Sequence, residues 1–518
     1  MARFYIENFG CRATQADGAA MERQFLERGL ERAPAARDAE IVVLNTCTVT
    51  DGADKDARAS IRRLRRVNPD CRILVTGCYA QRAPQELAAL PGVTWVVGNS
   101  HKHQVAEIAT ASSSSPAGFV PLAQLSGKAA RFTHNPTERE GIDPPPNSEA
   151  HAEVIVGDIF AHTELMAAPV FEAANERTRP NLKVQDGCDN RCSFCVIPYV
   201  RGQSRSLPEE RVLAEVRTLV EAGYREVVIS GINLGRWGRD LGGQPSGFSH
   251  QPSGFSGQVT LASGDARLVN LLRAILSRTS LEKLRISSVE PMDWSDELIE
   301  LVASSSRIAK HAHVPMQSGS DSVLRRMHRK YRPWHYREKI LKIRRAMPFA
   351  AIGADVMVGF PGETEVEFDE TRRMIEELPF TYLHVFTYSA RPGTPAAEQV
   401  GQVPVALARD RNRVLREIAS RKKVEFMQSL LGTTVGAITL QTGDADSTEA
   451  LTDNYLKMRV SGRVGANRWI DVRVAGLAGE MLEGRWEPER AAVEPALAPV
   501  TGSARTFTNA LTGNPLHA

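Results

Sequence analysis

Cysteine is scarce in this chain of 518 residues, which contains only seven. So few cysteines exclude the disulfide framework of a small secreted protein, and their odd number indicates a reducing compartment and metal binding. Long apolar runs are missing too. No stretch approaches the 18 apolar residues of a membrane span, and the N-terminus MARFYIENFG has no basic segment before a long apolar run. We therefore expect no membrane span, no signal peptide and a cytoplasmic location.

A strong excess of one charge is also absent. The formal net charge is +3, which is too small by itself to indicate a nucleic-acid partner. Hydrophobic residues make up 42% of the chain and charged residues 24%, as in an ordinary globular protein. A chain of this length predicts about two to four domains, each with its own core.

Three of the seven cysteines lie close together in the segment QDGCDNRCSFCVIPY. Cys188, Cys192 and Cys195 have C-x3-C-x2-C spacing and follow an apolar run. Three thiolates leave one iron of a cubane cluster free, whereas structural zinc normally takes four protein ligands. The spacing therefore favours an iron–sulfur cluster with an open position for a substrate or cofactor. The alternative is a zinc knuckle that lacks one ligand.

Residues 1–105 alternate between strand and helix patterns, which predicts an open α/β sheet domain. A helix pattern covers 15–30 and places Met21, Phe25 and Leu26 on one face. A second helix pattern covers 54–66. The strand patterns are the runs ARFYIE (2–7), EIVVLN (40–45), RILVTG (72–77) and VTWVVGN (93–99).

Three further cysteines each follow one of these strand patterns. Cys11, Cys47 and Cys78 come after the first, second and third runs. The carboxyl ends of strands in an open α/β sheet share one edge, where ligands bind, so these cysteines are expected to converge. The alternative is that each is a small buried hydrophobic residue. Cys71 precedes its strand, and we interpret it as structural.

Six further strand patterns separated by amphipathic helices predict a partial or split (βα)6 barrel over 178–425, whose working face is at the carboxyl ends of its strands. Residues 106–177 are interpreted as a partly ordered linker, and the tandem QPSGFS copies at 244–257 as a flexible insertion. A basic helix at 406–423 precedes a small β-barrel at 426–490, and 491–518 is expected to be a disordered tail. The six patterns are 182–187, 226–231, 283–290, 311–316, 351–360 and 382–389.

With both cysteine triads in place, the chain resembles the radical S-adenosylmethionine (SAM) methylthiotransferases over 1–105 and 178–490. Its motifs are most similar to those of the branch that acts on N6-threonylcarbamoyladenosine at position 37 of tRNA. Its last barrel resembles the RNA-binding TRAM domain. One departure is Thr14, where the family usually has Asn; Thr keeps a hydroxyl but lacks the amide. The matching motifs are NTCTVT (45–50), VTGCYAQ (75–81), LKVQDGCDNRCSFCVIPYVRG (182–202), QSGSD (317–321), GFPGET (359–364) and FTYSARPGTPAA (386–397).

The resemblance implies that each triad holds a [4Fe–4S] cluster. The cluster on Cys188, Cys192 and Cys195 would bind SAM and generate a 5′-deoxyadenosyl radical that abstracts the hydrogen from C2 of the adenine. The cluster on Cys11, Cys47 and Cys78 would carry or donate the sulfur, and a second SAM would supply the methyl group. The resemblance also implies two partners, the anticodon loop of tRNA and an electron donor such as flavodoxin or ferredoxin. It implies a monomeric chain.

Contacts to SAM are expected from residues at the strand ends of the central barrel. Glycines there allow close backbone approach, and polar side chains there can hydrogen-bond a ligand. The alternative for each polar residue is hydrogen bonding to loop backbone. The candidates are Gly231, Asn233, Gly235, Ser288, Glu290, Gln317 and Asp355.

Three clusters of basic residues predict contacts to RNA phosphates. The first comprises Arg58, Arg62, Arg63, Arg65 and Arg66, and the second Arg325, Arg326, Arg329, Lys330 and Arg332. The third is the basic helix. The segment 431–490 carries nine acidic and seven basic residues, so RNA binding by the last barrel rests on the resemblance alone.

Three alternative functions stay open at this point. The chain could act on isopentenyl-modified adenosine 37 in tRNA, or on an aspartate of a ribosomal protein, with the same clusters. From a different class, it could be a non-catalytic iron–sulfur protein that binds RNA.

Overall fold

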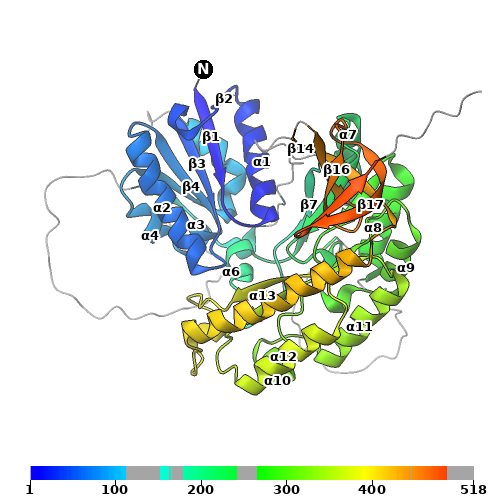
Figure 1. Ribbon diagram of the computed structural model, residues 1–518. Coiled ribbons are helices and arrows are strands. Elements are labelled where there is room, and N and C mark those ends of the chain that lie inside the picture. The colour runs from blue at the N-terminus through cyan, green and yellow to red at the C-terminus, as the bar shows by residue number, and fades with distance from the viewer. Residues whose placement is uncertain are drawn as a thin grey trace, which may run out of the picture.

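The computed structural model describes residues 2–111, 152–162, 165, 179–241, 265–444 and 446–486. For residues 265–267 it describes the backbone alone. The predicted insertion at 244–257 and the predicted tail at 491–518 lie outside the described residues. The described chain forms a sheet domain, a central barrel flanked by helices, and a small β-barrel (Figure 1).

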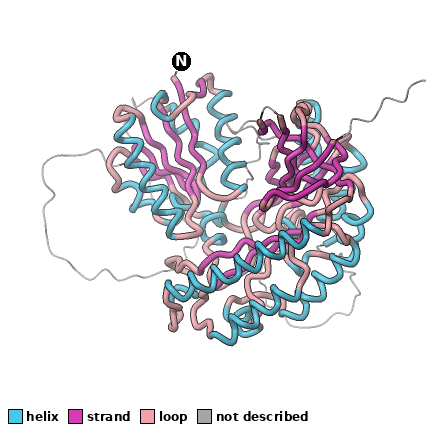
Figure 2. The backbone as a smooth tube through the Cα atoms, in the orientation of Figure 1, coloured by secondary structure: helices cyan, strands magenta, loops and turns pink. Residues whose placement is uncertain are grey.

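The N-terminal sheet is parallel throughout, with the strand order β2-β1-β3-β4-β5-β6. Helices cover both of its faces (Figure 2). α1 (Arg12–Glu27) and α5 (Val105–Thr110) pack on one face, while α2 (Asp51–Val67) and α4 (Pro84–Ala88) pack on the other. The strands are β1 (Arg3–Asn8), β2 (Glu31–Arg32), β3 (Ile41–Thr46), β4 (Arg72–Gly77), β5 (Val93–Gly98) and β6 (Glu153–Ile155).

One expectation for this domain needs correction. Met21 and Phe25 are buried in the α1 face of the core, but Leu26 is 51% exposed. Leu26 follows Phe25 directly, so it points about 100° further round the helix. The segment 106–177, which we interpret as a partly ordered linker, contains β6, and β6 pairs with β5 as the edge strand of the sheet.

The central domain contains all six predicted strands, arranged as a split barrel. β7 (Asn181–Asp186), β9 (Glu226–Gly231) and β10 (Lys283–Ile286) are parallel neighbours. β11 (His311–His313), β12 (Ala351–Val358) and β13 (Tyr382–Thr387) form a second parallel sheet. One parallel bridge, Leu284 to Ile308, joins the two halves. A two-residue antiparallel strand, β8 (Arg205–Ser206), was not predicted because it is too short to show a pattern.

The helices of the central domain alternate with its strands and share one apolar core with them, except for α6, which packs against Cys78 instead. This alternation is the βα pattern that the sequence predicted. The helices are α6 (Ile197–Arg201), α7 (Glu209–Glu221), α8 (Asp265–Arg278), α9 (Asp296–Ser304), α10 (Asp321–Arg326), α11 (Pro333–Ala346) and α12 (Glu365–Glu377).

The long helix α13 (Val405–Gln428) packs along β13 and leads into a closed five-stranded barrel. The barrel order is β14-β15-β16-β18-β17, and its interior is apolar. The β-patterned runs TVGAITL (434–440), LKMRVSG (456–462) and RWIDVRVAG (468–476) correspond to β14, β16 and β17, whereas β15 and β18 show no such pattern. No helix among the described residues is long and apolar enough to cross a membrane. The strands are β14 (Thr434–Gly443), β15 (Ser447–Thr452), β16 (Lys457–Ser461), β17 (Trp469–Ala478) and β18 (Met481–Arg485).

Candidate functional site

The first cysteine triad lies at the carboxyl ends of three adjacent strands. Cys11 caps α1 after β1, Cys47 follows β3, and Cys78 begins the short helix α3 (Cys78–Arg82) after β4. Gly10 has φ +97°, and a Cβ there would sit 2.9 Å from the Cys47 Sγ, so only glycine lets the chain pass this close. The strand-end rule therefore brings the three side chains to one edge of the sheet, as predicted.

Polar side chains border this triad. The Thr14 hydroxyl lies 3.6 Å from the Cys11 Sγ, and the Asn99 amide donates to the Cys78 Sγ at 3.6 Å. Thr14 thus keeps a polar contact with the cysteine although it replaces the family's usual Asn. Asn99 was not predicted, although it follows β5 and so stands at the same sheet edge. Cys71, by contrast, is buried in the apolar core beside β4, which fits its structural interpretation.

The second triad occupies the loop between β7 and α6. This loop is braced from distant segments: the Ser193 N–H donates to the Met327 carbonyl at 3.1 Å, and the Ala396 N–H donates to the Ser193 carbonyl at 2.8 Å. Three donors point at its sulfurs. The Asn190 N–H lies 3.4 Å and the Asn233 amide 3.6 Å from the Cys188 Sγ, and the Arg329 guanidinium lies 3.3 Å from the Cys192 Sγ.

The first triad borders the segment that follows the second triad, across the boundary between the first two domains. Cys78 packs directly against Val196 and Val200, which follow Cys195 in the chain. Asn99 bridges the same boundary, because its amide also donates to the Val200 carbonyl at 2.6 Å. The sequence predicted both triads, but not that they are neighbours.

A buried network of charges joins the same two domains. Asp17 on α1 pairs with Lys102 at 2.8 Å, with Arg201 at 3.0 Å, and with Lys183. Asp186 pairs with Lys183 at 2.8 Å and with Arg201 at 3.0 Å. Burial alone would raise the pKa of Asp17, but Lys102, Lys183 and Arg201 hold this pKa below its ordinary value. The network therefore depends on ionised carboxylates.

Burial disfavours the thiolate form of several of these cysteines. It raises the pKa of Cys47 to about 12, with a further contribution from the nearby Cys78. It likewise raises the pKa of Cys188 to about 11 and that of Cys195 to about 12. Among the described residues, no group of three or more His, Cys, Asp or Glu is arranged closely enough to hold a single metal ion.

The residues predicted to contact SAM fall into three groups. Asn233 lies beside Cys188, and Glu290 pairs with Arg329 beside Cys192, so both border the second triad. Gly231 and Gly235 allow close packing, since a Cβ would lie 2.7 Å from the Gln185 Oε1 and 2.4 Å from the Asp293 Cβ, respectively.

Of the remaining three, Ser288 follows β10 in the first half-barrel, whereas Gln317 follows β11 and Asp355 lies on β12 in the second. The Ser288 hydroxyl is 2.8 Å from the His313 Nδ1, and the His313 Nε2 is 3.3 Å from the Asp355 carboxylate. Gln317 has φ +62° and donates its N–H to the Asp355 carbonyl at 2.8 Å. The structure thus links Ser288, Asp355 and Gln317 to each other, and not directly to the cysteine loop.

The structure corrects two of the predicted RNA contacts. Arg329 is buried between Cys192 and Glu290. Arg411, in the basic helix, is also buried and pairs with Glu363 at 2.8 Å. Other members have protein partners at the surface: Arg63 pairs with Glu7 at 2.8 Å, and Arg326 with Glu367 at 2.9 Å. Spacing along the chain could not distinguish these roles, because each partner lies on another element.

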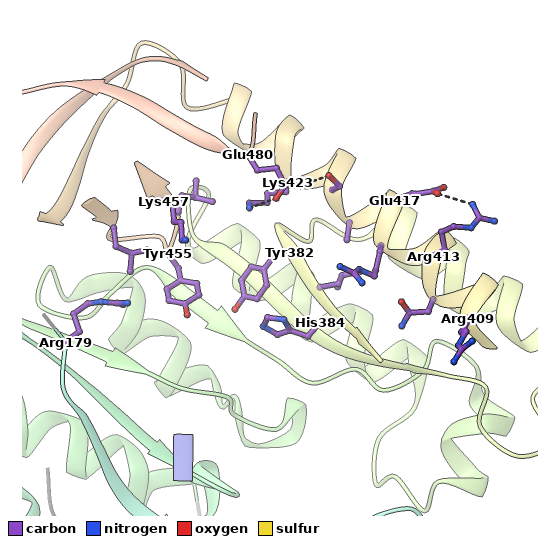
Figure 3. A pocket seen from close by; sticks show the side chains of 17 residues that line it. Arg179, Tyr382, His384, Arg409, Arg413, Glu417, Lys423, Tyr455, Lys457 and Glu480 are labelled. Atoms are coloured by element: carbon purple, nitrogen blue, oxygen red, sulfur yellow. Dashed lines mark hydrogen bonds and ion pairs between the residues drawn. The ribbon is translucent and has the colours of Figure 1, made fainter. Parts of the chain in front are cut away.

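A cavity of about 780 Å³ opens where the central domain, α13 and the small barrel meet (Figure 3). Tyr382, His384 and Tyr455 lie in a row along one side, and Arg179 points toward Tyr455. Its two acidic residues are paired, Glu417 with Arg413 at 3.0 Å and Glu480 with Lys423 at 2.8 Å. The basic residues that line it are Arg179, Arg409, Arg413, Arg416, Lys423 and Lys457.

Comparison with known proteins defines the class. The model of the radical SAM superfamily matches residues 182–375, and the model described as uncharacterized protein family UPF0004 matches residues 3–98. Two proteins named threonylcarbamoyladenosine tRNA methylthiotransferase MtaB are similar. The one from Bacillus subtilis is 34% identical over 89% of this chain and 91% of its own length, and the one from Aquifex aeolicus is 33% identical over 88% and 96%.

A third relative carries another name. The tRNA-2-methylthio-N(6)-dimethylallyladenosine synthase of Erythrobacter litoralis is 30% identical over 85% of this chain and 87% of its own length. The chain is therefore a radical SAM enzyme. Within that class, it belongs to the family of the tRNA methylthiotransferases.

Enzymes of this family use SAM and two [4Fe–4S] clusters. The residues present fit such groups. N–H donors surround the sulfurs of the second triad, as is usual where hydrogen bonds tune a cluster. The Asn233 Oδ1 and Gln317 Oε1 atoms are buried without a hydrogen-bond partner, and such acceptors suit the donor groups of a bound ligand.

Proposed function

We propose that this enzyme adds a methylthio group to C2 of N6-threonylcarbamoyladenosine at position 37 of tRNA, using two SAM molecules and a sulfur donor. The observation that carries the proposal is the packing of Cys78 against Val196 and Val200, which follow Cys195 in the chain. It supports an arrangement in which a triad that handles sulfur lies near a triad that handles SAM. The relatives from Bacillus subtilis and Aquifex aeolicus that bear this substrate in their names support it.

Each triad has its own task in this proposal. Cys188, Cys192 and Cys195 hold the cluster that binds SAM, and Cys11, Cys47 and Cys78 hold the second cluster. When bound, these groups supply the radical, sulfur and methyl chemistry that acid–base side chains cannot perform on an aromatic C–H bond.

The other predicted residues position SAM. Asn233 and Glu290 act next to the cysteine loop, where their contacts to Cys188 and Arg329 place them. Ser288, Gln317 and Asp355 act deeper in the barrel, and Gly231 and Gly235 keep the strand ends tightly packed.

The cavity between α13, β13 and the small barrel receives the anticodon loop. Its basic residues suit phosphates, and its rings suit stacked bases. A base in a loop is already unpaired, so presenting it to the clusters costs less than extruding it from a duplex. The proposal includes a cytoplasmic, monomeric enzyme reduced by a flavodoxin or ferredoxin.

A second candidate substrate is isopentenyl-modified adenosine 37, since a relative named for dimethylallyladenosine is 30% identical. The two N6 substituents differ in charge: the threonylcarbamoyl group carries a carboxylate, whereas the isopentenyl group is apolar. The cationic lining of the cavity favours the charged substituent. A ribosomal-protein aspartate and a non-catalytic RNA-binding role remain outcomes of the tests below.

The first test is mass spectrometry of tRNA nucleosides from a host that lacks its own position-37 methylthiotransferases, makes both precursors and expresses this chain. We expect a new methylthio-threonylcarbamoyladenosine. A methylthio-isopentenyl product would keep the chemistry and correct the substrate. No new nucleoside, with both clusters loaded, would shift the function to a protein substrate or to RNA binding alone.

The second test separates the two triads. Cys192→Ala is expected to abolish formation of 5′-deoxyadenosine from SAM, whereas Cys78→Ala is expected to preserve it and to lose sulfur insertion. Each variant should lose about four iron atoms per chain. Cys71→Ala is the matched control and should keep the iron content and both activities. A Cys78→Ala enzyme that still makes the methylthio nucleoside would refute the second assignment.

A further inference from the structure

Tyr455 stands at a junction of all three domains. It belongs to the turn between β15 and β16 and has φ +68°, a left-handed conformation that is unfavourable for a bulky residue. Neighbouring contacts hold this turn against the central domain: the Asn454 amide donates to the Phe349 carbonyl at 3.0 Å, and Lys283 pairs with Asp453 at 3.2 Å. Such a conformation persists only where the surroundings fix it, and it often marks a functional position.

Three guanidinium groups surround the Tyr455 side chain. Arg12 from the N-terminal domain donates to its hydroxyl at 3.1 Å. Arg285 and Arg179 lie 5.3 and 5.9 Å from the centre of its ring. Glu226 lies 2.6 Å from Arg285 and 3.5 Å from Arg179, so these two cations share one carboxylate, and Arg12 adds a third cation. The junction therefore carries an excess of positive charge.

Arg12 is the cation of this group that is available to a ligand. It is exposed, and within the described ranges no carboxylate lies within 4.0 Å of its guanidinium, whereas Arg285 is buried against Glu226. Arg12 also follows Cys11 directly in the chain, so it lies between a residue of the first triad and Tyr455, which lines the cavity. A guanidinium held by one hydrogen bond keeps four N–H donors free for a planar anion.

Aromatic rings extend from this cation into the cavity. The rings of His311 and Tyr455 are 4.7 Å apart, those of Tyr382 and Tyr455 are 6.1 Å apart, and those of Tyr382 and His384 are 5.3 Å apart. Figure 3 shows Tyr455, Tyr382 and His384 in succession along the cavity. A modified base stacked on these rings would bring its N6 substituent within reach of the cations around Tyr455.

We infer that Arg12, held by the Tyr455 hydroxyl and assisted by Arg179, is the subsite that binds the carboxylate of the threonylcarbamoyl group and so determines which modified adenosine is accepted. The inference rests on the proposed function. A guanidinium matches a carboxylate in a bidentate manner, and a site built to bind a charged group discriminates strongly against an analogue that lacks it.

The experiment measures binding of anticodon stem-loop RNAs to the full-length chain by fluorescence anisotropy. The RNAs carry threonylcarbamoyladenosine, isopentenyladenosine or unmodified adenosine at position 37. We expect the wild type to prefer the first RNA and Arg12→Gln to weaken its binding at least tenfold. The same variant should bind the other two RNAs within twofold of the wild type. Arg12→Lys should retain part of the preference.

Two further variants control for loss of structure. Arg28→Gln removes an exposed arginine at the other end of α1, which pairs with Glu107 at 3.5 Å, and should bind all three RNAs like the wild type. Tyr455→Phe removes only the hydroxyl and should weaken binding of the threonylcarbamoyl RNA selectively, by a smaller factor. Iron content is compared across all variants.

If Arg12→Gln weakened the binding of all three RNAs equally, the inference would be overturned, because Arg12 would then contact phosphate or support the fold. Unchanged preference in Arg12→Gln would also overturn it. Failure of the proposed function is distinguishable: the wild type would form no methylthio product on the threonylcarbamoyl RNA, while the binding preference would still be measured.

Discussion

Arg329 illustrates how a single side chain can act on a cysteine loop that is far away in sequence. Its guanidinium lies 3.3 Å from the Cys192 Sγ and pairs with Glu290. A buried cation and N–H donor beside a cluster ligand stabilise the more negative, reduced state of the cluster. We therefore expect Arg329 to tune the cluster that we propose on Cys192, rather than to contact phosphate as its basic neighbours suggested.

Replacing Arg329 with Met should lower the reduction potential of the SAM-binding cluster. The expected shift is about 20 to 65 mV, which corresponds to the loss of one hydrogen bond of about 0.5–1.5 kcal/mol. The measurement is a redox titration followed by electron paramagnetic resonance. Lys330→Met, at the exposed neighbouring residue, is the matched control and should leave the potential unchanged. Equal potentials in both variants would refute the tuning role.

At the scale of elements, α13 combines two roles on one basic helix. Its inner side carries Arg411, which is buried against Glu363, while its outer side carries Arg413, which lines the cavity and pairs with Glu417 at the surface. Burial raises the pKa of Glu363, an effect that the Arg411 cation opposes. Arg411 is therefore expected to contribute to the stability of the fold, whereas Arg413 is expected to contribute little.

The two arginines should respond differently to the same substitution. Arg411→Met leaves the Glu363 carboxylate buried without its partner, which is expected to lower the free energy of unfolding by about 3–5 kcal/mol. Arg413→Met removes an exposed ion pair and should change the free energy of unfolding by about 0.5 kcal/mol or less. Urea unfolding of the full chain followed by circular dichroism measures both. Similar losses in the two variants would contradict the division of roles.

At the scale of the whole molecule, the charge network around Asp17 holds the two cluster-bearing domains together. Asp17 comes from α1, Lys183 and Asp186 from β7, and Arg201 from the end of α6. Because these groups are buried, the attraction between them is screened little by solvent. The network thus fixes the boundary at which Cys78 meets Val196.

Asp17→Asn should destabilise the full chain by about 3–5 kcal/mol at pH 7, because three buried cations lose a shared partner. The folded pKa of Asp17 lies below its unfolded value of about 3.9. Its stabilisation is therefore complete above about pH 5 and is lost as the pH falls through and below 4, at up to about 1.4 kcal/mol per pH unit.

The difference in the free energy of unfolding between the wild type and Asp17→Asn should accordingly become smaller as the pH falls from 5 to 3. Urea midpoints at a series of pH values measure it. Asp51→Asn is the control, because Asp51 is exposed and its ion pair with Lys55 lies at the surface. A difference that stays constant from pH 7 to pH 3 would show that Asp17 does not act through its charge.

The sequence alone determined the features that local patterns encode. Apolar runs identified the six strands of the central barrel, since buried parallel strands are continuously apolar. The two cysteine triads followed from spacing and from the strand-end rule, because parallel strands end at a common edge. Short or half-exposed strands such as β6, β8 and β15 were not predicted, because too few of their residues repeat to give a pattern.

Only the tertiary structure decided which of these features meet. The contact of Cys78 with Val196, the pairing of Arg411 with Glu363, and the hydrogen bond from Arg12 to Tyr455 join residues from different elements. In the last of these, the partners are 443 positions apart. Periodicity and spacing describe neighbours along the chain, whereas these contacts arise when domain cores pack and buried charges find partners. For that reason the class of chemistry could be predicted from the residues, while the junction of Arg12 and Tyr455, which we propose as a substrate-binding subsite, became visible only in the folded molecule.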